Sequence, residues 1–119
     1  VNCGFYEGIQ NRQALKVVKN FTQHIDKIKY GGGIGVGTGP FIYGSANIPW
    51  EAKIKASVKD GIDNLIQAIS NGESINKDLF VEANMNKVLY IQAGNLGWIS
   101  SGFKNKVYLR GFNKKPYRK

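Results

Sequence analysis

The chain has 119 residues, a net charge of +9 and 42% apolar residues, values that suit one globular domain. It contains no apolar run long enough for a membrane-spanning helix and no secretory signal pattern, so we expect a cytoplasmic protein. The single cysteine excludes an intramolecular disulfide and a multi-cysteine metal site. Because the first residue is Val1 rather than Met, we expect a processed or trimmed chain with sequence missing upstream.

The positive charge is concentrated near the C-terminus. Residues 1–82 hold nine Lys or Arg and eight Asp or Glu, whereas residues 83–119 hold eight Lys or Arg and no acid. The basic end could bind nucleic acid or an anionic surface. The nearly neutral body has no recognition motif, so nucleic-acid binding is not expected.

The first elements read as the end of a strand followed by a helix. Val1–Gly4 suits a strand end, and Phe5–Gly8 suits a loop. Asn11 is a plausible N-cap for a helix that reaches about Lys29. Apolar residues recur along it at spacings of three and four, at Leu15, Val18, Phe21, Ile25 and Ile28. His24 has no metal-ligating neighbour on this helix, so we expect it to be a partly exposed helix residue.

Residues 31–39, the glycine ladder, hold six of the fifteen glycines. Ile34, Val36 and Thr38 alternate with glycines, so a strand with one bare face is predicted. A bare face allows close approach by another backbone, a helix or a flat ligand, and both packing and ligand contact stay open. The ladder fits neither the dinucleotide fingerprint nor the phosphate loop, so it does not predict phosphate binding.

A turn-rich loop, 40–46, separates the ladder from a second predicted helix. Asn47 as N-cap and Pro49 in the first turn favour a helix that runs to about Ser70 and stops at Asn71-Gly72. Its expected buried stripe is Ile54, Val58, Ile62, Leu65, Ile66 and Ile69, and Gly61 marks a site of close packing. The order strand, helix, strand, helix predicts a parallel sheet with crossover helices, in which the connection from the first strand to the second through the first helix should be right-handed.

The remaining chain has a weaker pattern. Residues 73–84 contain only a short apolar piece, Leu79–Val81. Residues 84–98 predict a helix that is apolar over most of its circumference, so it is either buried or faces a partner. Residues 104–119 have seven basic residues and no clear period, so irregular or mobile chain is expected there.

Two groups of residues resemble the C-terminal half of flavodoxin-like NAD(P)H-dependent oxidoreductases, which are FMN-reductase-type flavoproteins. The first group is Asn2-Cys3-Gly4-Phe5-Tyr6-Glu7-Gly8, Gln10-Asn11, Ala14-Leu15 and the glycine ladder. The second group is Asn86-Lys87-Val88-Leu89-Tyr90, Gly97-Trp98 and the basic end near Tyr117-Arg118. The resemblance covers nearly the whole chain through the order of these pieces.

The resemblance implies an α/β, partial flavodoxin-like three-layer fold. Val1–Gly4 and Gly31–Thr38 would be strands 4 and 5 with crossover helices, followed by a C-terminal helix and basic tail. Residues 1–103 would be the C-terminal part of a flavodoxin-like domain, and residues 104–119 the tail.

The resemblance also implies a flavin site, because the family uses the loop after strand 4 to touch the FMN ring. The implied cofactor-binding residues are Cys3, Gly4, Phe5, Tyr6, Glu7, Gly8, Gly37 and Gly39. Phe5 or Tyr6 would cover the ring or else anchor the loop against the core. Flavin chemistry requires no protein acid or base, and neither a catalytic residue nor a metal is implied.

Strands 1 to 3 of the family, and the loop that cradles the FMN phosphate, have no counterpart here. We therefore expect a fragment or truncated form of an FMN-dependent NAD(P)H oxidoreductase. The intact protein would transfer hydride to a quinone, a flavin or a small acceptor, whereas this chain alone would be inactive and bind FMN poorly. The open edge of strand 4 predicts a homo-oligomer or pairing with a missing N-terminal half. The alternative is a non-enzymatic α/β module that self-associates without a cofactor.

Overall fold

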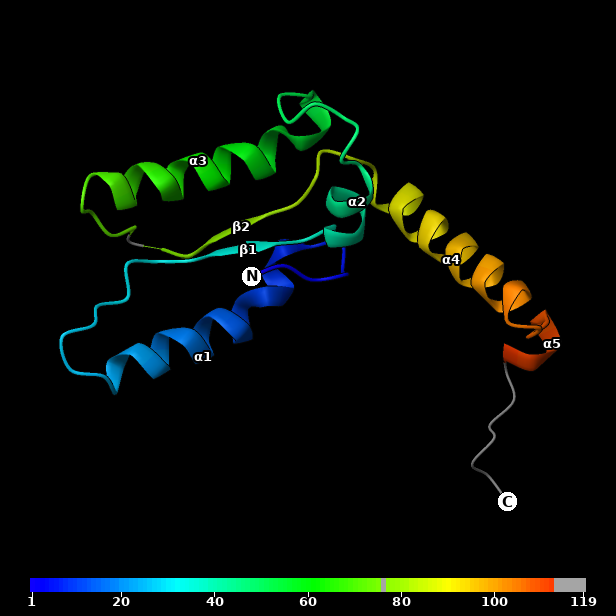
Figure 1. The fold of residues 1–119 in the computed structure, drawn as a ribbon, viewed down its shortest axis with the longest axis horizontal. Coiled ribbons are helices and arrows are strands. Elements are labelled where there is room, and N and C mark those ends of the chain that lie inside the picture. Colours follow the sequence, from blue (N-terminus) through cyan, green and yellow to red (C-terminus); the bar gives the residue numbers. More distant parts are fainter. Residues whose placement is uncertain (76, 113–119) are drawn as a thin grey trace, which may run out of the picture. The chain divides into compact units, whose positions relative to one another are not determined.

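The computed structural model describes residues 1–75 and 77–112, which divide into one compact unit, 1–85, and a second that begins at residue 86. The elements of the first unit are η1 (Gly8–Asn11), α1 (Arg12–Gln23), β1 (Ile34–Val36), α2 (Gly39–Gly44), η2 (Lys53–Lys55), α3 (Ala56–Ser70) and β2 (Leu79–Val81) (Figure 1). The second unit contains α4 (Lys87–Lys104) and α5 (Leu109–Phe112). The structure divides the chain at residue 86, whereas the expected boundary lay between residues 103 and 104, within the last turn of α4.

The first unit is built on parallel strands. β1 pairs with β2 in parallel, with Ile34 opposite Leu79 and Val36 opposite Val81. On the other edge of β1, residues 1–3 form a parallel bridge centred on Asn2, and we call them the first-strand segment. The amide of Cys3 donates to the Val36 carbonyl oxygen at 3.0 Å. The predicted α/β class with parallel strands and crossover helices is confirmed, and β2 is a strand that the sequence pattern showed only as a short apolar piece.

The two faces of the sheet are covered by different helices, α1 on one side and α3 on the other (Figure 1). A Cβ atom built on Gly35 would lie 2.8 Å from the Asn11 Cβ, at the start of α1. On the opposite face, a Cβ atom on Gly61 of α3 would lie 2.9 Å from the Ile34 Cδ1. The close packing predicted at Gly61 is therefore confirmed, and the bare face of the ladder receives the chain's own backbone and helix.

The two crossovers differ in hand. The first-strand segment, β1 and β2 lie in sequence order, so both connections step across the sheet in the same direction. Because α1 and α3 lie on opposite faces, one connection must be right-handed and the other left-handed. Right-handed crossovers dominate among parallel strands, so this pair of connections is an uncommon arrangement.

Several predicted boundaries are wrong. The strand of the ladder spans only Ile34–Val36, and α1 ends at Gln23 rather than near Lys29. Turns follow α1, including Lys27 with a positive φ of 68°, and they end the helical repeat. The apolar face of α1 is largely exposed, since Leu15 is its only buried residue.

The second helix does not begin at Asn47. The proline that lies in the first turn of a helix is Pro40 rather than Pro49. Pro40 belongs to α2, a short helix within the predicted loop. The long helix α3 begins only at Ala56. The stop signal at Asn71-Gly72 is confirmed: Gly72 has a φ of +68°, and the amides of Gly72 and Glu73 donate to Ile69 and Ala68. This hydrogen-bond pair is a Schellman motif, which satisfies the last carbonyls of the helix.

The second unit contains the predicted apolar helix. The Asn86 side chain caps α4 by accepting the amides of Val88 and Leu89 at 2.8 and 3.3 Å. None of the α4 residues is buried, which excludes the first of the two predicted alternatives, a buried helix. α4 extends beyond Trp98 to Lys104, and α5 forms where irregular chain was expected. Residues 113–119 lie outside the described residues.

We predict that Gly35→Ala destabilises the protein by about 1–3 kcal/mol, since the new methyl would overlap Asn11, the Phe80 ring and the Gly8 carbonyl oxygen. Gly31→Ala is the matched control in the same ladder, because its Cβ would meet only the Ser74 Oγ at 3.9 Å. Urea unfolding measures both changes. Equal midpoints for the two variants would contradict the packing described for the glycine face.

Candidate functional site

The implied cofactor residues converge at the carboxyl ends of the first-strand segment and β1. Residues 3–8, which we call the carboxyl-end loop, cross directly over the turn that follows β1. The amide of Gly39 donates to the Cys3 carbonyl oxygen at 3.0 Å, and the amide of Thr38 donates to the Phe5 carbonyl oxygen at 2.7 Å. The carboxyl ends of parallel strands are where α/β proteins bind ligands. The structure therefore brings the eight implied residues together.

Thr38 stands at the centre of this cluster. It is fully buried and adopts a left-handed conformation with φ 53° and ψ 28°. A β-branched residue is strained there, and such strain tends to persist where neighbouring contacts hold it. Its Oγ1 donates to the Gly37 carbonyl oxygen at 2.7 Å and accepts the Ala83 amide at 2.9 Å. Sequence reasoning placed Thr38 only on a strand face, although its two glycine neighbours signalled an unusual backbone.

Part of the implied site anchors the loop. The Tyr6 hydroxyl donates to the Met85 carbonyl oxygen at 2.7 Å, and the Gly8 amide donates to the Glu82 Oε2 at 3.0 Å. Gly8 and Gly37 pack against each other so closely that a Cβ on Gly37 would lie 2.6 Å from the Gly8 nitrogen. Between the two roles considered for Tyr6, these contacts support anchoring.

The Asn11 side chain connects the carboxyl-end loop to β1. Its side chain is 3% exposed, and its Nδ2 lies within hydrogen-bond distance of the Gly8 and Val36 carbonyl oxygens, at 3.1 and 3.0 Å. The same nitrogen lies 3.3 Å from the Cys3 Sγ. Asn11 occupies the predicted N-cap position but makes no side-chain capping bond. Its side-chain amide instead contacts main-chain carbonyl oxygens of the carboxyl-end loop and of β1.

Gly4 and Phe5 form the open part of the loop. The Phe5 side chain is 65% exposed, and a Cβ on Gly4 would meet only the Pro40 Cγ at 3.9 Å. Glu7 is half-buried beside them. This part of the loop thus presents an exposed aromatic ring next to an exposed position without a side chain.

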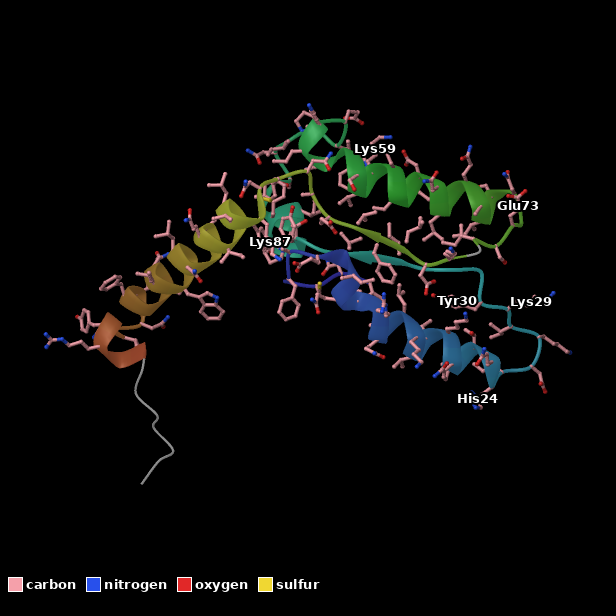
Figure 2. All side chains as sticks on the ribbon, turned by 180° about the vertical axis from the view of Figure 1, so that it is seen from behind. His24, Lys29, Tyr30, Lys59, Glu73 and Lys87 are labelled. Atoms are coloured by element: carbon pink, nitrogen blue, oxygen red, sulfur yellow. The ribbon has the colours of Figure 1, made fainter. Side chains whose placement is uncertain are left out.

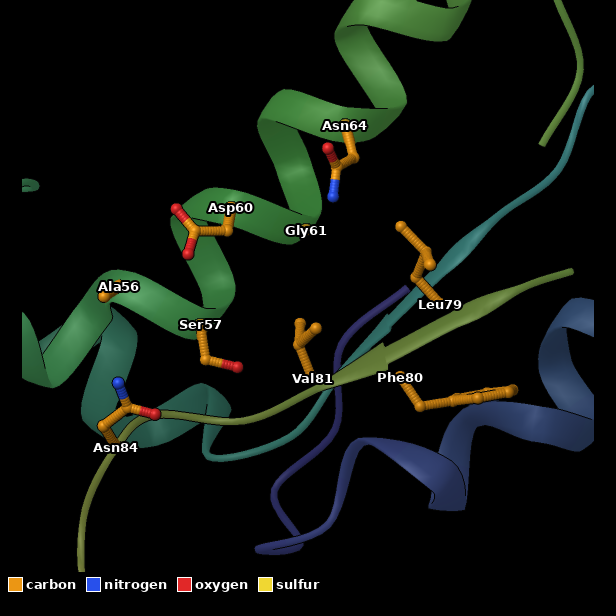
Figure 3. Close-up of a pocket in the computed structure, with 9 residues that line it drawn as sticks. All are labelled: Ala56, Ser57, Asp60, Gly61, Asn64, Leu79, Phe80, Val81 and Asn84. Atoms are coloured by element: carbon orange, nitrogen blue, oxygen red, sulfur yellow. The ribbon is translucent and has the colours of Figure 1, made fainter.

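Shallow grooves run along β2, away from the carboxyl-end loop. One groove of about 400 Å³ lies between α3 and β2 and contains Ser57, Asp60 and Asn64 (Figure 3). A second groove, of about 610 Å³, lies on the α1 side, and Arg12, Lys19 and Lys77 line it. Neither contains any of the eight implied cofactor residues.

Two ionisable groups outside the loop have defined partners that sequence reasoning missed. Tyr30 donates its hydroxyl to the Asp78 Oδ1 at 2.7 Å; burial, followed by this hydrogen bond and the charge of Asp78, raises the pKa of Tyr30 to about 12. Lys55 is 3% exposed, and its Nζ donates to the Ser45 and Ile48 carbonyl oxygens at 2.6 and 2.8 Å. The buried ammonium thus closes the turn after α2, a role that an isolated lysine in a sequence does not reveal.

His24 is exposed (Figure 2) and is the C-cap residue of α1 rather than a residue within the helix. Its Nδ1 is 2.7 Å from the Asn20 carbonyl oxygen. Within residues 1–75 and 77–112, no group of His, Cys, Asp and Glu is arranged to hold a metal ion.

Comparisons with family models, with curated proteins and with solved structures each returned no significant match. Among the described helices, none combines the length and apolar character needed to cross a bilayer.

Replacing Asn11 by alanine should cost about 1–3 kcal/mol of unfolding free energy, because buried carbonyl oxygens lose their donor. The Cys3 thiol should also react faster with a disulfide reagent once the loop is loosened. Asn20→Ala, at an exposed position of the same helix, is the control and should change stability by less than about 0.5 kcal/mol. Unchanged stability and thiol reactivity in Asn11→Ala would refute this anchoring role.

The raised pKa of Tyr30 predicts that the folded protein loses stability at high pH. Its folded pKa of about 12 exceeds the ordinary value of 10.0, so the protonated phenol stabilises the fold fully below pH 10. That contribution is lost as pH rises toward 12. Unfolding free energies between pH 8 and pH 11.5 should fall less steeply in Tyr30→Phe than in the wild type. Tyr43→Phe, at an 88% exposed side chain, controls for the loss of a surface tyrosine; equal slopes in Tyr30→Phe and wild type would oppose the assignment.

Proposed function

We propose that this chain is part of an FMN-dependent NAD(P)H oxidoreductase and contains the residues that contact the flavin ring. The observation that carries the proposal is the convergence of the implied residues at the carboxyl ends of parallel strands, with an exposed Phe5 above a strained, buried Thr38. Bound FMN would supply hydride transfer from NAD(P)H to a quinone, a flavin or a small acceptor. The chain's own residues would bind and orient the ring.

The contacts of the carboxyl-end loop divide this work among its residues. Tyr6 and Gly8 hold the loop through Met85 and Glu82, and Phe5 is free to cover one face of the ring. Gly4 is exposed and has no side chain, so the flavin ring could lie close to the main chain there. Glu7 is the acid beside this position.

Binding by this chain alone is expected to be weak. The resemblance assigns the FMN phosphate to a loop that has no counterpart in this sequence, so ring contacts alone must provide the affinity. A partner that completes the sheet would then be required for turnover.

The first test is titration of FMN with the purified chain, followed by quenching of flavin fluorescence. We expect saturable quenching with a dissociation constant in the high micromolar range. Phe5→Ala should weaken binding about two- to tenfold, the range of one aromatic contact.

Phe21→Ala is the matched control, since Phe21 is 64% exposed, like Phe5, and lies on α1 away from the loop. Equal weakening by both variants would indicate nonspecific contact with exposed aromatic rings. Absence of quenching by the wild type up to millimolar concentration would remove the flavin proposal for this chain.

A second candidate function is a non-enzymatic α/β module that self-associates without a cofactor. It is favoured by α4, which exposes Leu89, Leu96 and Trp98 by 62%, 66% and 77%. The FMN titration separates the two candidates, because the module predicts no change in flavin fluorescence.

A further inference from the structure

The groove on the α1 side of the sheet gathers positive charge. Its volume of about 610 Å³ is within the range of small-molecule sites. Arg12 and Lys19 line it from α1, and Lys77 lines it from the segment before β2. Among the described residues of the lining, these three cations and one carboxylate, Asp78, leave a formal charge of +2. We call this site the basic groove, and its other lining residues are Tyr30, Ile75 and Phe80.

Two glycines of the ladder make room for the side chains at the base of this groove. A Cβ atom on Gly33 would lie 2.6 Å from the Tyr30 hydroxyl oxygen and 3.5 Å from the Asp78 Oδ1. A Cβ atom on Gly35 would lie 2.8 Å from the Phe80 Cδ1. Phe80 therefore points toward α1 (Figure 3). The bare face of the ladder thus places a polar pair and an aromatic ring in the same groove as the cations.

The three cations have no acidic partner among the described residues. α1 contains no Asp or Glu, and in the described part of the chain no ion pair joins Arg12, Lys19 or Lys77 to a carboxylate. The Lys19 Nζ lies 5.8 Å from the centroid of the Tyr30 ring, a cation–π contact that holds it beside the groove. Positive charges gathered around a concave surface attract an anion.

The carboxylate of Asp78 is engaged within the protein. Its Oδ1 accepts the Tyr30 hydroxyl at 2.7 Å, and the same oxygen lies close to Gly33. The hydrogen bond therefore keeps this oxygen at the glycine face of the ladder. An anion can contact the cations of the groove, although the charge of Asp78 opposes its binding, and this opposition gives the proposal below a test of sign.

The charge and the aromatic ring together select a class of ligand. The formal charge of +2 matches the roughly two negative charges of a phosphate monoester near neutral pH, and Arg and Lys side chains bind phosphate oxygens. The Phe80 ring offers an apolar contact for a planar group. Nucleic acid fits less well, because residues 1–82 hold nearly equal numbers of basic and acidic residues, whereas binding along a phosphate backbone requires an extended basic face.

We propose that the basic groove binds a small phosphate ester of a planar ring, as in a nucleotide. The cations of the groove contact the phosphate group, and Phe80 contacts the ring. This site is independent of the flavin proposal, because no described residue of the carboxyl-end loop lines the basic groove.

The test is isothermal titration calorimetry of the full chain with adenosine monophosphate (AMP), adenosine and inorganic phosphate, with circular dichroism to confirm that each variant is folded. AMP should bind at least about fivefold more tightly than adenosine or phosphate, since it alone supplies both contacts. Lys19→Gln and Lys77→Gln should each weaken AMP binding about three- to tenfold. Asp78→Asn should strengthen it, because asparagine keeps an acceptor for the Tyr30 hydroxyl and removes the opposing charge.

Lys53→Gln is the matched control, because Lys53 is exposed and lies outside the groove, and it should leave AMP binding unchanged. Phe5→Ala should also leave it unchanged, so the result does not depend on the flavin titration. Equal weakening by Lys19→Gln and Lys53→Gln would overturn the proposal by indicating nonspecific attraction to a basic protein. Adenosine binding as tight as AMP binding, weaker binding by Asp78→Asn, or no AMP binding by the wild type up to about 5 mM would each overturn it as well.

Discussion

The first unit depends on the close approach of residues 6–11 to the glycine face of β1. Gly8 lies so near the main chain of Val81 and Gly35 that no side chain could be accommodated there, and Gly35 in turn leaves room for Asn11. This contact lets one polar side chain, Asn11, hold the carboxyl-end loop, the start of α1 and β1 together. Because interiors tolerate little overlap, a methyl group added here would shift all three segments.

The same constraint shapes the candidate site. With Tyr6, Gly8 and Asn11 holding the loop, its remaining residues are carried over the carboxyl end of β1, beside Thr38. The left-handed conformation of Thr38 is maintained by five hydrogen-bonding groups around it, including the Phe5 carbonyl oxygen and the Ala83 amide. An over-determined, strained residue beside an exposed aromatic ring is a reasonable place to look for ligand binding.

The described chain buries little apolar surface. Its buried apolar residues are Leu15, Val36, Val58, Ala68 and Ala83, whereas large apolar side chains on α1, α3 and α4 are exposed. Such a small core provides limited stabilisation against the entropy of the unfolded chain.

The sequence by itself determined the local features. Alternation in the ladder predicted a strand, Asn71-Gly72 predicted the end of α3, and Gly61 predicted close packing, because glycine and helix-stop signals act through neighbouring backbone. Helical periodicity also placed apolar faces on α1 and α3. It could not show which part of each face meets the sheet, since that depends on where β2 pairs.

Only the tertiary structure decided the long-range features. The pairing of β2 with β1, the contact of Tyr6 with Met85 and the burial of Lys55 join residues that are distant or unremarkable in sequence. The ladder illustrates the division. Its bare face was evident from the residue pattern, but whether a ligand or the chain itself filled it depended on how α1 folds back, and the chain's own backbone occupies that space.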